Sequence, residues 1–503
     1  MKPNILLITA DQWRGDCVSA LGHPAVVTPM LDALAKEGTL FARHYAGAAP
    51  CSPARASIYT GLYQMNHRVC RNGSPLDARF DTVALAARRA GYDPTLFGYT
   101  DTAPDPRGLA PSDPHLTTYE GVLPGFTVRR LLPEHEKPWL SWLKARGTEP
   151  NRGCPHAPDG VPVGTIGVPP VYGADETQTA FLVDEFLQWQ GEQEAPWFAH
   201  ISFLRPHPPF VVPEPFNSMF DPATLPVPVR AETPEAEMAA HPLIASLLAT
   251  LARSHFVAGA DGLVRDWTPA DFAAIQAVYY GMIAEVDAQL GRLFSALKAR
   301  GDWENTVVVL TSDHGEMMGE HWAFGKGGYF DGSYHIPLVI RDPAASAGAG
   351  QIVRKFTSAA DLMPTLCERM GVEPQNHLDG ASLRPFLDGK MPEDWREAAF
   401  FEFDFREVEG ESTKAQFGLG PDQCNLAVLR DERYKYVHCA GLPPLLFDLE
   451  RDPGELVNRA EDPDYLRIRL AYAEQLLTLR ARHLDQTLAF SMVTANGLVT
   501  TKG

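Results

Sequence analysis

Residues 49–63 read Ala49-Pro-Cys-Ser-Pro-Ala-Arg-Ala-Ser-Ile-Tyr-Thr-Gly-Leu-Tyr63. The stretch places Cys51 just ahead of a segment that can continue as a helix, where free N–H groups and the helix dipole favour an anion. Pro53 suits the first helical turn, since its missing donor costs nothing there. Arg55 lies one turn on, and its guanidinium can bind a tetrahedral oxyanion at the same point. The spacing therefore predicts an anion site, although a buried cysteine beside a helix start would give the same pattern.

The composition is that of an ordinary globular protein. The chain has 503 residues, of which 45% are hydrophobic and 21% charged, and its net charge is −19. This length predicts two or more domains with a large core. The negative charge argues against general binding to nucleic acid or to an anionic membrane, but a local basic pocket can still hold an anion.

Apolar runs and helical periodicity alternate through the first three quarters of the chain, up to about residue 375. Strands are expected at 4–9, 95–99, 197–203, 306–311 and 336–340, and helices at 29–38, 82–90, 175–189 and 272–297. The pattern predicts an α/β domain at 1–375, built on a large, mixed, mostly parallel sheet flanked by helices. Asp175 is the expected N-cap of its helix. Residues 104–173 are rich in Pro and Gly and are expected to form a loop insertion.

The pattern changes near residue 376. Short strands separated by turns are expected at 400–403, 426–429, 434–437 and 445–449, followed by a helix at 465–484. We therefore predict a smaller C-terminal α+β domain at 376–503 that contains an antiparallel sheet. The polar tail is either a loose terminus, which is the default, or an arm that docks onto another subunit, and we expect a homo-oligomer.

Two strand ends carry groups that can bind a metal. Asp11 and Gln12 follow the first strand, and Asp313 and His314 follow the β-branched strand at 306–311. Two carboxylates, an amide oxygen and an imidazole form a credible site for one divalent ion. Hard oxygens with one imidazole suit Ca²⁺ or Mn²⁺, and Zn²⁺ less clearly.

Several motifs together resemble the sulfatase family of the alkaline-phosphatase superfamily. Cys51-x-Pro-x-Arg55 matches the sulfatase signature, and Asp313-His-Gly followed by Gly-Lys326-Gly matches a second family segment. His207 lies in Pro-His-Pro-Pro, which is similar to the family's Pro-His-x-Pro element, and residues 446–458 resemble its closing element. The resemblance covers nearly the whole chain.

The resemblance implies an alkaline-phosphatase-like fold and assigns roles to the matching residues. Cys51 is expected to be oxidised to formylglycine by a separate maturation enzyme, and to serve as nucleophile and as an additional metal ligand. Lys326 is expected to contact the scissile group or the leaving oxygen, and His207 to bind substrate and protonate that oxygen.

Two departures from the family pattern narrow the resemblance. Gln12 stands where many sulfatases carry a second Asp, and Tyr99 stands where many carry a substrate-binding lysine. These features are most similar to the phosphonate monoester hydrolase branch, whose members also cleave sulfate monoesters and phosphate diesters. Tyr99 is thus a candidate substrate-binding residue. Asp101 is expected to face Arg107 or a cationic part of the substrate.

The resemblance favours a metal-dependent, formylglycine-using hydrolase of small-molecule sulfate or phosphonate esters, of the arylsulfatase type. Two alternatives stay open: a two-metal phosphatase or mutase of the same superfamily, and a silent binding protein in which Cys51 remains a thiol. The opening residues are too short for a secretory signal, and no stretch is long enough to span a membrane. The seven cysteines, at positions 17, 51, 70, 154, 367, 424 and 439, suit a reducing compartment. We therefore expect a cytoplasmic protein.

Overall fold

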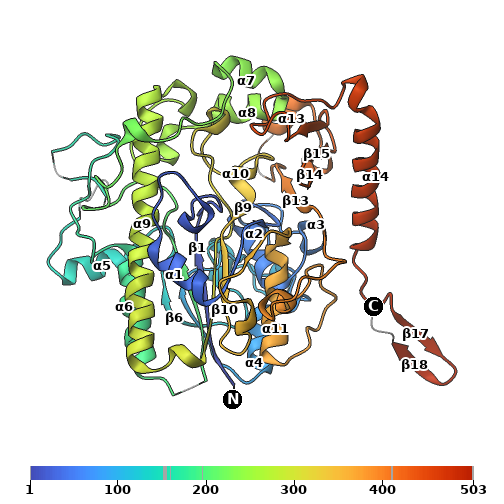
Figure 1. The fold of residues 1–503 in the computed structure, drawn as a ribbon, viewed down its shortest axis with the longest axis horizontal. Helices are drawn as coiled ribbons and strands as arrows, with labels where there is room; N and C mark the ends of the chain where they lie inside the picture. The colour runs from blue at the N-terminus through green and yellow to red at the C-terminus, as the bar shows by residue number, and fades with distance from the viewer. Residues whose placement is uncertain are drawn as a thin grey trace.

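The protein is described by a computed structural model in which a central sheet lies between two layers of helices (Figure 1). The described residues are 2–150, 156–158, 160–194, 196–408, 410 and 412–500. Cys154 lies outside them. The long helix α9 (Pro269–Arg300) and the helix α14 (Leu466–Arg482) lie on opposite sides of the molecule (Figure 1). The hairpin of β17 (Ser491–Thr494) and β18 (Gly497–Thr500) projects beyond the end of α14.

The central sheet has eight strands in the order β11-β2-β10-β8-β1-β7-β5-β6. Their bounds are β1 Asn4–Ala10, β2 Thr39–Phe41, β5 Pro94–Gly98, β6 Thr127–Leu131, β7 Phe198–Phe203, β8 Thr306–Thr311, β10 Leu338–Arg341 and β11 Ile352–Val353. Strands β8, β1, β7, β5 and β6 are parallel, whereas β10 runs antiparallel to both of its neighbours. The expected mixed, mostly parallel sheet is confirmed.

Helices cover both faces of this sheet because its central strands are apolar on both sides. The helices are α1 Pro29–Glu37, α6 Gln178–Gly191 and α9 Pro269–Arg300 on one face, and α2 Cys51–Thr60, α4 Val83–Arg89 and α11 Leu362–Met370 on the other. In β1, Leu6 and Ile8 pack into the core with the first set, and Ile5 and Leu7 into the core with the second. The N-terminal end of α2 thereby comes to lie beside the carboxyl ends of β1 and β8.

A second sheet of five strands is built mainly from the C-terminal part of the chain. Its order is β16-β15-β14-β13-β4, with bounds β4 Ala48–Ala49, β13 Ala399–Asp404, β14 Asn425–Arg430, β15 Tyr434–Cys439 and β16 Leu445–Asp448. The four C-terminal strands are antiparallel, as expected. The fifth strand, β4, comes from the N-terminal part and pairs parallel with β13. The two parts of the chain therefore share a sheet just before Cys51.

An ion pair also joins the two parts. Lys435 on β15 is 0% exposed, and its Nζ lies 2.9 Å from Asp331 of α10 (Asp331–Tyr334) and 2.8 Å from Glu455. Burial of a cation is tolerated only where acidic partners compensate its charge. The chain ends with α14 (Leu466–Arg482) and the strands β17 (Ser491–Thr494) and β18 (Gly497–Thr500).

Three local expectations are corrected by the structure. Residues 104–173 contain β6 and the helix α5 (Lys137–Ala145); β6 lies at the sheet edge with several exposed side chains, so it lacks the apolar run of a buried strand. The N-cap of α6 is Thr177, whose side chain accepts a hydrogen bond from the N–H of Ala180, and not Asp175. The strand expected at 336–340 is divided into β9 (His335–Ile336) and β10, with Pro337 between them.

Within the described part of the chain, we find no helix that combines the length and the apolar character needed to cross a membrane.

Candidate active site

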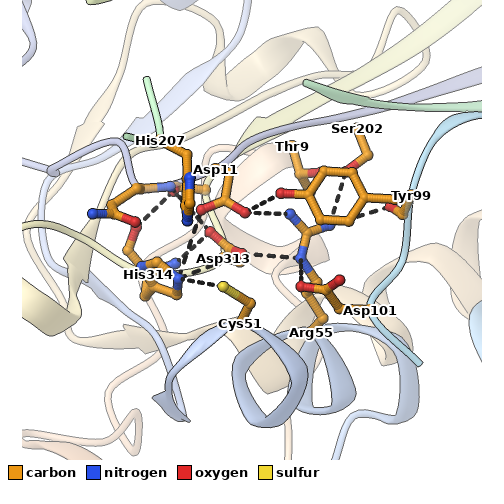
Figure 2. A network of polar contacts seen from close by, with 12 residues as sticks. Thr9, Asp11, Cys51, Arg55, Tyr99, Asp101, Ser202, His207, Asp313 and His314 are labelled. Atoms are coloured by element: carbon orange, nitrogen blue, oxygen red, sulfur yellow. Dashed lines mark hydrogen bonds and ion pairs between the residues drawn. The ribbon is translucent and has the colours of Figure 1, made fainter. Parts of the chain in front are cut away.

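Cys51 is the first residue of α2 and lies in the middle of a buried polar cluster (Figure 2). Its Sγ is 3.2 Å from Nε2 of His314 and 3.2 Å from Nζ of Lys326. Burial raises the pKa of the Cys51 thiol well above its ordinary value, and the nearby carboxylate of Asp11 adds to this effect. An unmodified Cys51 would therefore be a neutral thiol and a weak nucleophile.

The predicted metal ligands come together because β1 and β8 are parallel neighbours. Asp11 follows β1, and Asp313 and His314 follow β8 after Ser312, so their side chains meet at one edge of the sheet. One ligand atom from each of Asp11, Cys51, Asp313 and His314 lies within 4.8 Å of the others, and all four residues are buried. The arrangement has the size of a single ion site.

Two observations test whether these groups fit a cation. Oδ1 of Asp11 is buried and has no hydrogen-bond partner among the residues that the structure describes. Burial lowers the pKa of His314 to about 3, and the charge of Lys326 adds to this, so the imidazole is neutral and its Nε2 can act as a ligand. The donor set therefore fits a divalent cation.

The two carboxylates of the cluster differ in their proton affinity. Burial raises the pKa of Asp313 to about 6, and the charge of Asp11 raises it further. Burial would also raise the pKa of Asp11, but attraction to the protonated form of His207, to Lys326 and to Arg55 holds it well below its usual range. Two adjacent buried carboxylates repel each other when both are ionised, and a bound cation would offset that repulsion.

Gln12 reaches the cluster with its amide held at both ends. Its Oε1 accepts a 2.7 Å hydrogen bond from Nζ of Lys326, and its Nε2 donates to the carboxyl group of Glu316. Burial raises the pKa of Glu316 to about 8. Glu316 fixes which end of the amide faces Lys326. This role of Glu316 was not predicted from the sequence, although Glu316 stands three residues after Asp313 in the same motif.

The guanidinium of Arg55 contacts carboxylates of the protein, and its predicted contact with a substrate oxyanion remains a prediction. Its guanidinium is 0% exposed; Nε lies 3.0 Å from Asp313 and an Nη 3.0 Å from Asp11. The other Nη donates to Oγ of Ser202 at 2.8 Å and to the carbonyl oxygen of Tyr99 at 3.3 Å. Figure 2 shows the guanidinium among these groups. In this arrangement Arg55 orients the two carboxylates.

Ser202 was also missed by the sequence analysis. It lies inside β7, where its Oγ accepts hydrogen bonds from Arg55 and from Oγ1 of Thr9 at 3.2 Å. Its only sequence signal is a small polar residue within an apolar strand.

Tyr99 and Asp101 lie on the Arg55 side of the cluster (Figure 2). The Tyr99 hydroxyl donates to Oδ2 of Asp11, and its ring lies 4.3 Å from Cζ of Arg55. Asp101 does not face Arg107, which pairs with Asp105 and Asp77. Its carboxylate is 4.0 Å from Nε of Arg55, and neither of its oxygens has a hydrogen-bond partner in the described structure.

His207 borders a cavity of about 460 Å³ whose walls include Glu134 and Pro208. Its Nδ1 lies 2.7 Å from the carbonyl oxygen of Pro208, which leaves Nε2 as the nitrogen free to act in the site. Burial lowers the pKa of His207, and the charge of Lys326 adds to this effect. Figure 2 shows the ring beside Asp11.

Comparisons with known proteins agree over the full length of the chain. The sulfatase family model matches residues 3–372, and a model for the C-terminal part of N-sulphoglucosamine sulphohydrolase matches residues 319–482. A solved phosphonate monoester hydrolase of Agrobacterium radiobacter is 64% identical, with a TM-score of 0.98 and 100% coverage of both chains.

Two curated relatives extend the comparison. A multifunctional alkaline phosphatase superfamily protein of Trinickia caryophylli is 40% identical over 510 residues, which cover 99% of both chains. An arylsulfatase of Clostridium perfringens is 27% identical over 493 residues, which cover 95% of this chain and 94% of that protein. The chain thus belongs to the sulfatase family of the alkaline phosphatase superfamily.

Proposed function

We propose that this protein is a metal-dependent hydrolase that cleaves sulfate monoesters, phosphonate monoesters and phosphate diesters with a formylglycine formed from Cys51. The observation that carries the proposal is the position of Cys51, whose Sγ lies 3.2 Å from both His314 and Lys326 at the buried carboxylate cluster. The family membership and the phosphonate monoester hydrolase and arylsulfatase relatives support the same activity.

In the proposed reaction, water adds to the aldehyde at residue 51 and gives a carbon with two hydroxyl groups. One hydroxyl loses its proton to water and its oxygen attacks sulfur or phosphorus, and the bond to the leaving alcohol breaks. The second hydroxyl then loses its proton, the carbon–oxygen bond to the transferred group breaks, and the aldehyde re-forms. Sulfate or phosphonate leaves without water attacking the central atom.

The surrounding side chains would bind the metal, bind the transferred group and protonate the leaving oxygen. Asp11, Asp313 and His314, together with the group at residue 51, would hold one divalent cation, for which we expect Ca²⁺ or Mn²⁺ before Zn²⁺. Gln12 remains a predicted further ligand. When bound, the cation supplies positive charge that polarises the reacting oxygen. Lys326 reaches the position of residue 51 and can bind the transferred group. His207 can protonate the leaving oxygen, since an anionic substrate would raise its lowered pKa.

The two alternative functions have less support. A two-metal phosphatase or mutase needs a second set of ligands, and the described residues contain one group of His, Cys, Asp and Glu side chains with metal-site spacing. A binding protein without catalytic activity would keep Cys51 as a thiol. The mass of the peptide that contains residue 51 distinguishes this thiol from formylglycine. The maturation enzyme and the cytoplasmic location remain predictions.

The first prediction concerns residue 51. We expect peptide mass spectrometry of an active preparation to find formylglycine there, because a thiol cannot supply two hydroxyl groups on one carbon. Cys51→Ala should lose turnover while its circular dichroism stays unchanged, and Cys70→Ala is the matched control that keeps activity. Full activity from protein whose residue 51 is entirely cysteine would refute the mechanism.

The second prediction concerns the metal. Asp313→Ala removes a buried carboxylate of the cluster, so it should lose bound metal and activity together, as measured by elemental analysis and ester hydrolysis. Asp422→Ala, which removes an exposed carboxylate, should retain both. An Asp313→Ala protein that still holds one equivalent of metal would rule out the ligand assignment.

The third prediction concerns the charge of the substrate. Among the described residues, Lys326 is the one cationic side chain that hydrogen bonds to residue 51, because Arg55 is engaged by carboxylates and Tyr99 replaces a lysine. Without the lysine that Tyr99 replaces, the transition state of a doubly charged substrate should lose on the order of 3 kcal/mol of stabilisation. This corresponds to about 100-fold in kcat/KM. With p-nitrophenol as the common leaving group, the sulfate, phosphonate and phosphate diester should therefore exceed the phosphate monoester. Equal or faster cleavage of the phosphate monoester would contradict the charge argument.

We also propose that the protein is a homo-oligomer joined through the hairpin β17–β18. The hairpin projects from the molecule (Figure 1) and exposes Met492, Val493 and Leu498. An isolated two-stranded hairpin is marginally stable, and exposed apolar side chains on one are typical of a contact surface.

The fourth prediction tests this contact. Light scattering during gel filtration should give a multimer for the wild-type chain and a monomer for the double variant Val493→Lys with Leu498→Lys. The pair lies opposite across the two strands, so the added charges also repel each other. A Lys355→Ala variant, altered on a different surface, should remain a multimer. A monomeric wild-type protein would contradict the proposal.

A further inference from the structure

A second cavity, of about 400 Å³, is bordered by Lys326. Its walls come from two parts of the chain. Pro50, Arg71, Asn72, Lys326 and Gly327 belong to the catalytic part, and residues 403–407 belong to the end of β13 and the residues after it. No step of the proposed reaction places a group in this cavity.

The cavity adjoins the position of the nucleophile through Lys326 and Pro50. Lys326 lines it while its Nζ lies 3.2 Å from Sγ of Cys51. Pro50 directly precedes Cys51, and Oδ1 of Asn72 accepts a 3.0 Å hydrogen bond from the backbone N–H of Ser52. The cavity therefore opens beside residue 51, at the N-terminal end of α2.

The pairing of β4 with β13 explains why aromatic rings lie there. Ala49 is the register partner of Phe403, so the end of β13 is placed next to the residues that lead into α2. Phe403 and Phe405 are both half-buried, and their ring centroids are 6.3 Å apart with the planes inclined by 24°. Phe417 packs edge-on against Phe405 and supports it from behind. The rings form a preformed apolar wall.

Apart from Lys326, the charged side chains of this wall are held by protein partners. An Nη of Arg71 donates to the carbonyl oxygen of Arg406, and Glu407 accepts a hydrogen bond from the N–H of Thr413. Nε of Arg406 donates to both carboxylate oxygens of Asp404, at 2.8 and 2.9 Å. A guanidinium held this way is a poor binder of a second anion. The wall is therefore suited to an apolar, preferably planar, group.

The direction of the reaction decides which part of the substrate can reach this cavity. Displacement at sulfur or phosphorus places the nucleophile and the leaving group on opposite sides of the central atom. Pro50 and Asn72 flank the nucleophile, so the cavity cannot hold the leaving alcohol, which departs toward His207. A substituent that stays on the central atom points sideways and can enter. Phosphonate monoesters and phosphate diesters carry such a substituent, whereas sulfate monoesters do not.

We propose that this cavity, formed by Pro50, Asn72, Lys326, Phe403 and Phe405, is a binding subsite for an apolar aryl or alkyl substituent that remains on phosphorus. The inference rests on the proposed function and extends it by naming the substrate class. Substrates with a phosphorus-bound aromatic group gain contact with the rings, and substrates with a methyl group there do not.

The test compares two esters that share one leaving group. Wild type and Phe405→Ala are assayed with the p-nitrophenyl esters of phenylphosphonate and of methylphosphonate, and p-nitrophenyl sulfate reports any general loss of chemistry. Removing the ring should lower the ratio of kcat/KM for the phenyl over the methyl ester by about tenfold, because apolar contact area is lost. Phe220→Ala removes a half-buried ring far from the cavity and should leave this ratio unchanged.

An equal loss on all three esters, or an unchanged phenyl-to-methyl ratio, would overturn the subsite. If the alanine variant fails to fold, Phe405→Leu replaces it in the test, because leucine keeps apolar volume but has no planar ring. Phe405→Leu should lower the phenyl-to-methyl ratio of kcat/KM by a smaller factor.

A binding measurement separates failure of the subsite from failure of the proposed function. Calorimetry on Cys51→Ala protein, with and without Phe405→Ala, compares phenylphosphonic with methylphosphonic acid. If the wild type cleaves neither phosphonate ester, the proposed function is wrong for phosphonates. The subsite is still supported if phenylphosphonic acid binds more tightly and loses that advantage without the ring, and it is refuted if the two acids bind alike.

Discussion

The buried contacts of Arg55 with Asp11 and Asp313 are the constraint on which the rest of the site depends. Arg55 belongs to α2, whereas the two aspartates follow β1 and β8, so one guanidinium fixes the helix that begins with Cys51 against two strand ends. All three side chains are 0% exposed. Removing the arginine would leave carboxylates buried without a partner, at a cost of about 3–5 kcal/mol. The position of residue 51 relative to the metal ligands is therefore set by an ion pair as well as by packing.

The charges around this contact explain why metal binding and substrate binding fall to different side chains. Asp11, Asp313 and Asp101 surround Arg55, so buried carboxylates of the protein compensate its positive charge. His314 is neutral, which leaves the cluster short of positive charge and suited to a cation. Lys326 is positioned to meet substrate because Gln12 and Cys51 hold its Nζ at the site. Binding of the metal and binding of the anionic substrate are thus assigned to different groups.

The C-terminal sheet takes part in the site because it shares a strand with the catalytic part. Strand β4 pairs with β13 immediately before Cys51, and Lys435 joins the same sheet to Asp331. These contacts fix the rings at the end of β13 beside the nucleophile. A change in the C-terminal part can therefore alter which substituents fit, while the chemistry remains with residues of the first part.

The sequence by itself determined the family, the mixed and mostly parallel sheet, and the meeting of Asp11 with Asp313 and His314, because motif spacing and strand periodicity are local properties. The edge strand β6 was not predicted, because several of its side chains are exposed and its sequence therefore lacks the apolar run of a buried strand. Only the tertiary structure decided that Arg55 serves carboxylates, that Tyr99 donates to Asp11, and that Glu316 and Ser202 belong to the site. These roles depend on the direction of hydrogen bonds between residues far apart in the chain, and that direction is set by how helices and strands pack and not by the spacing of residues along them.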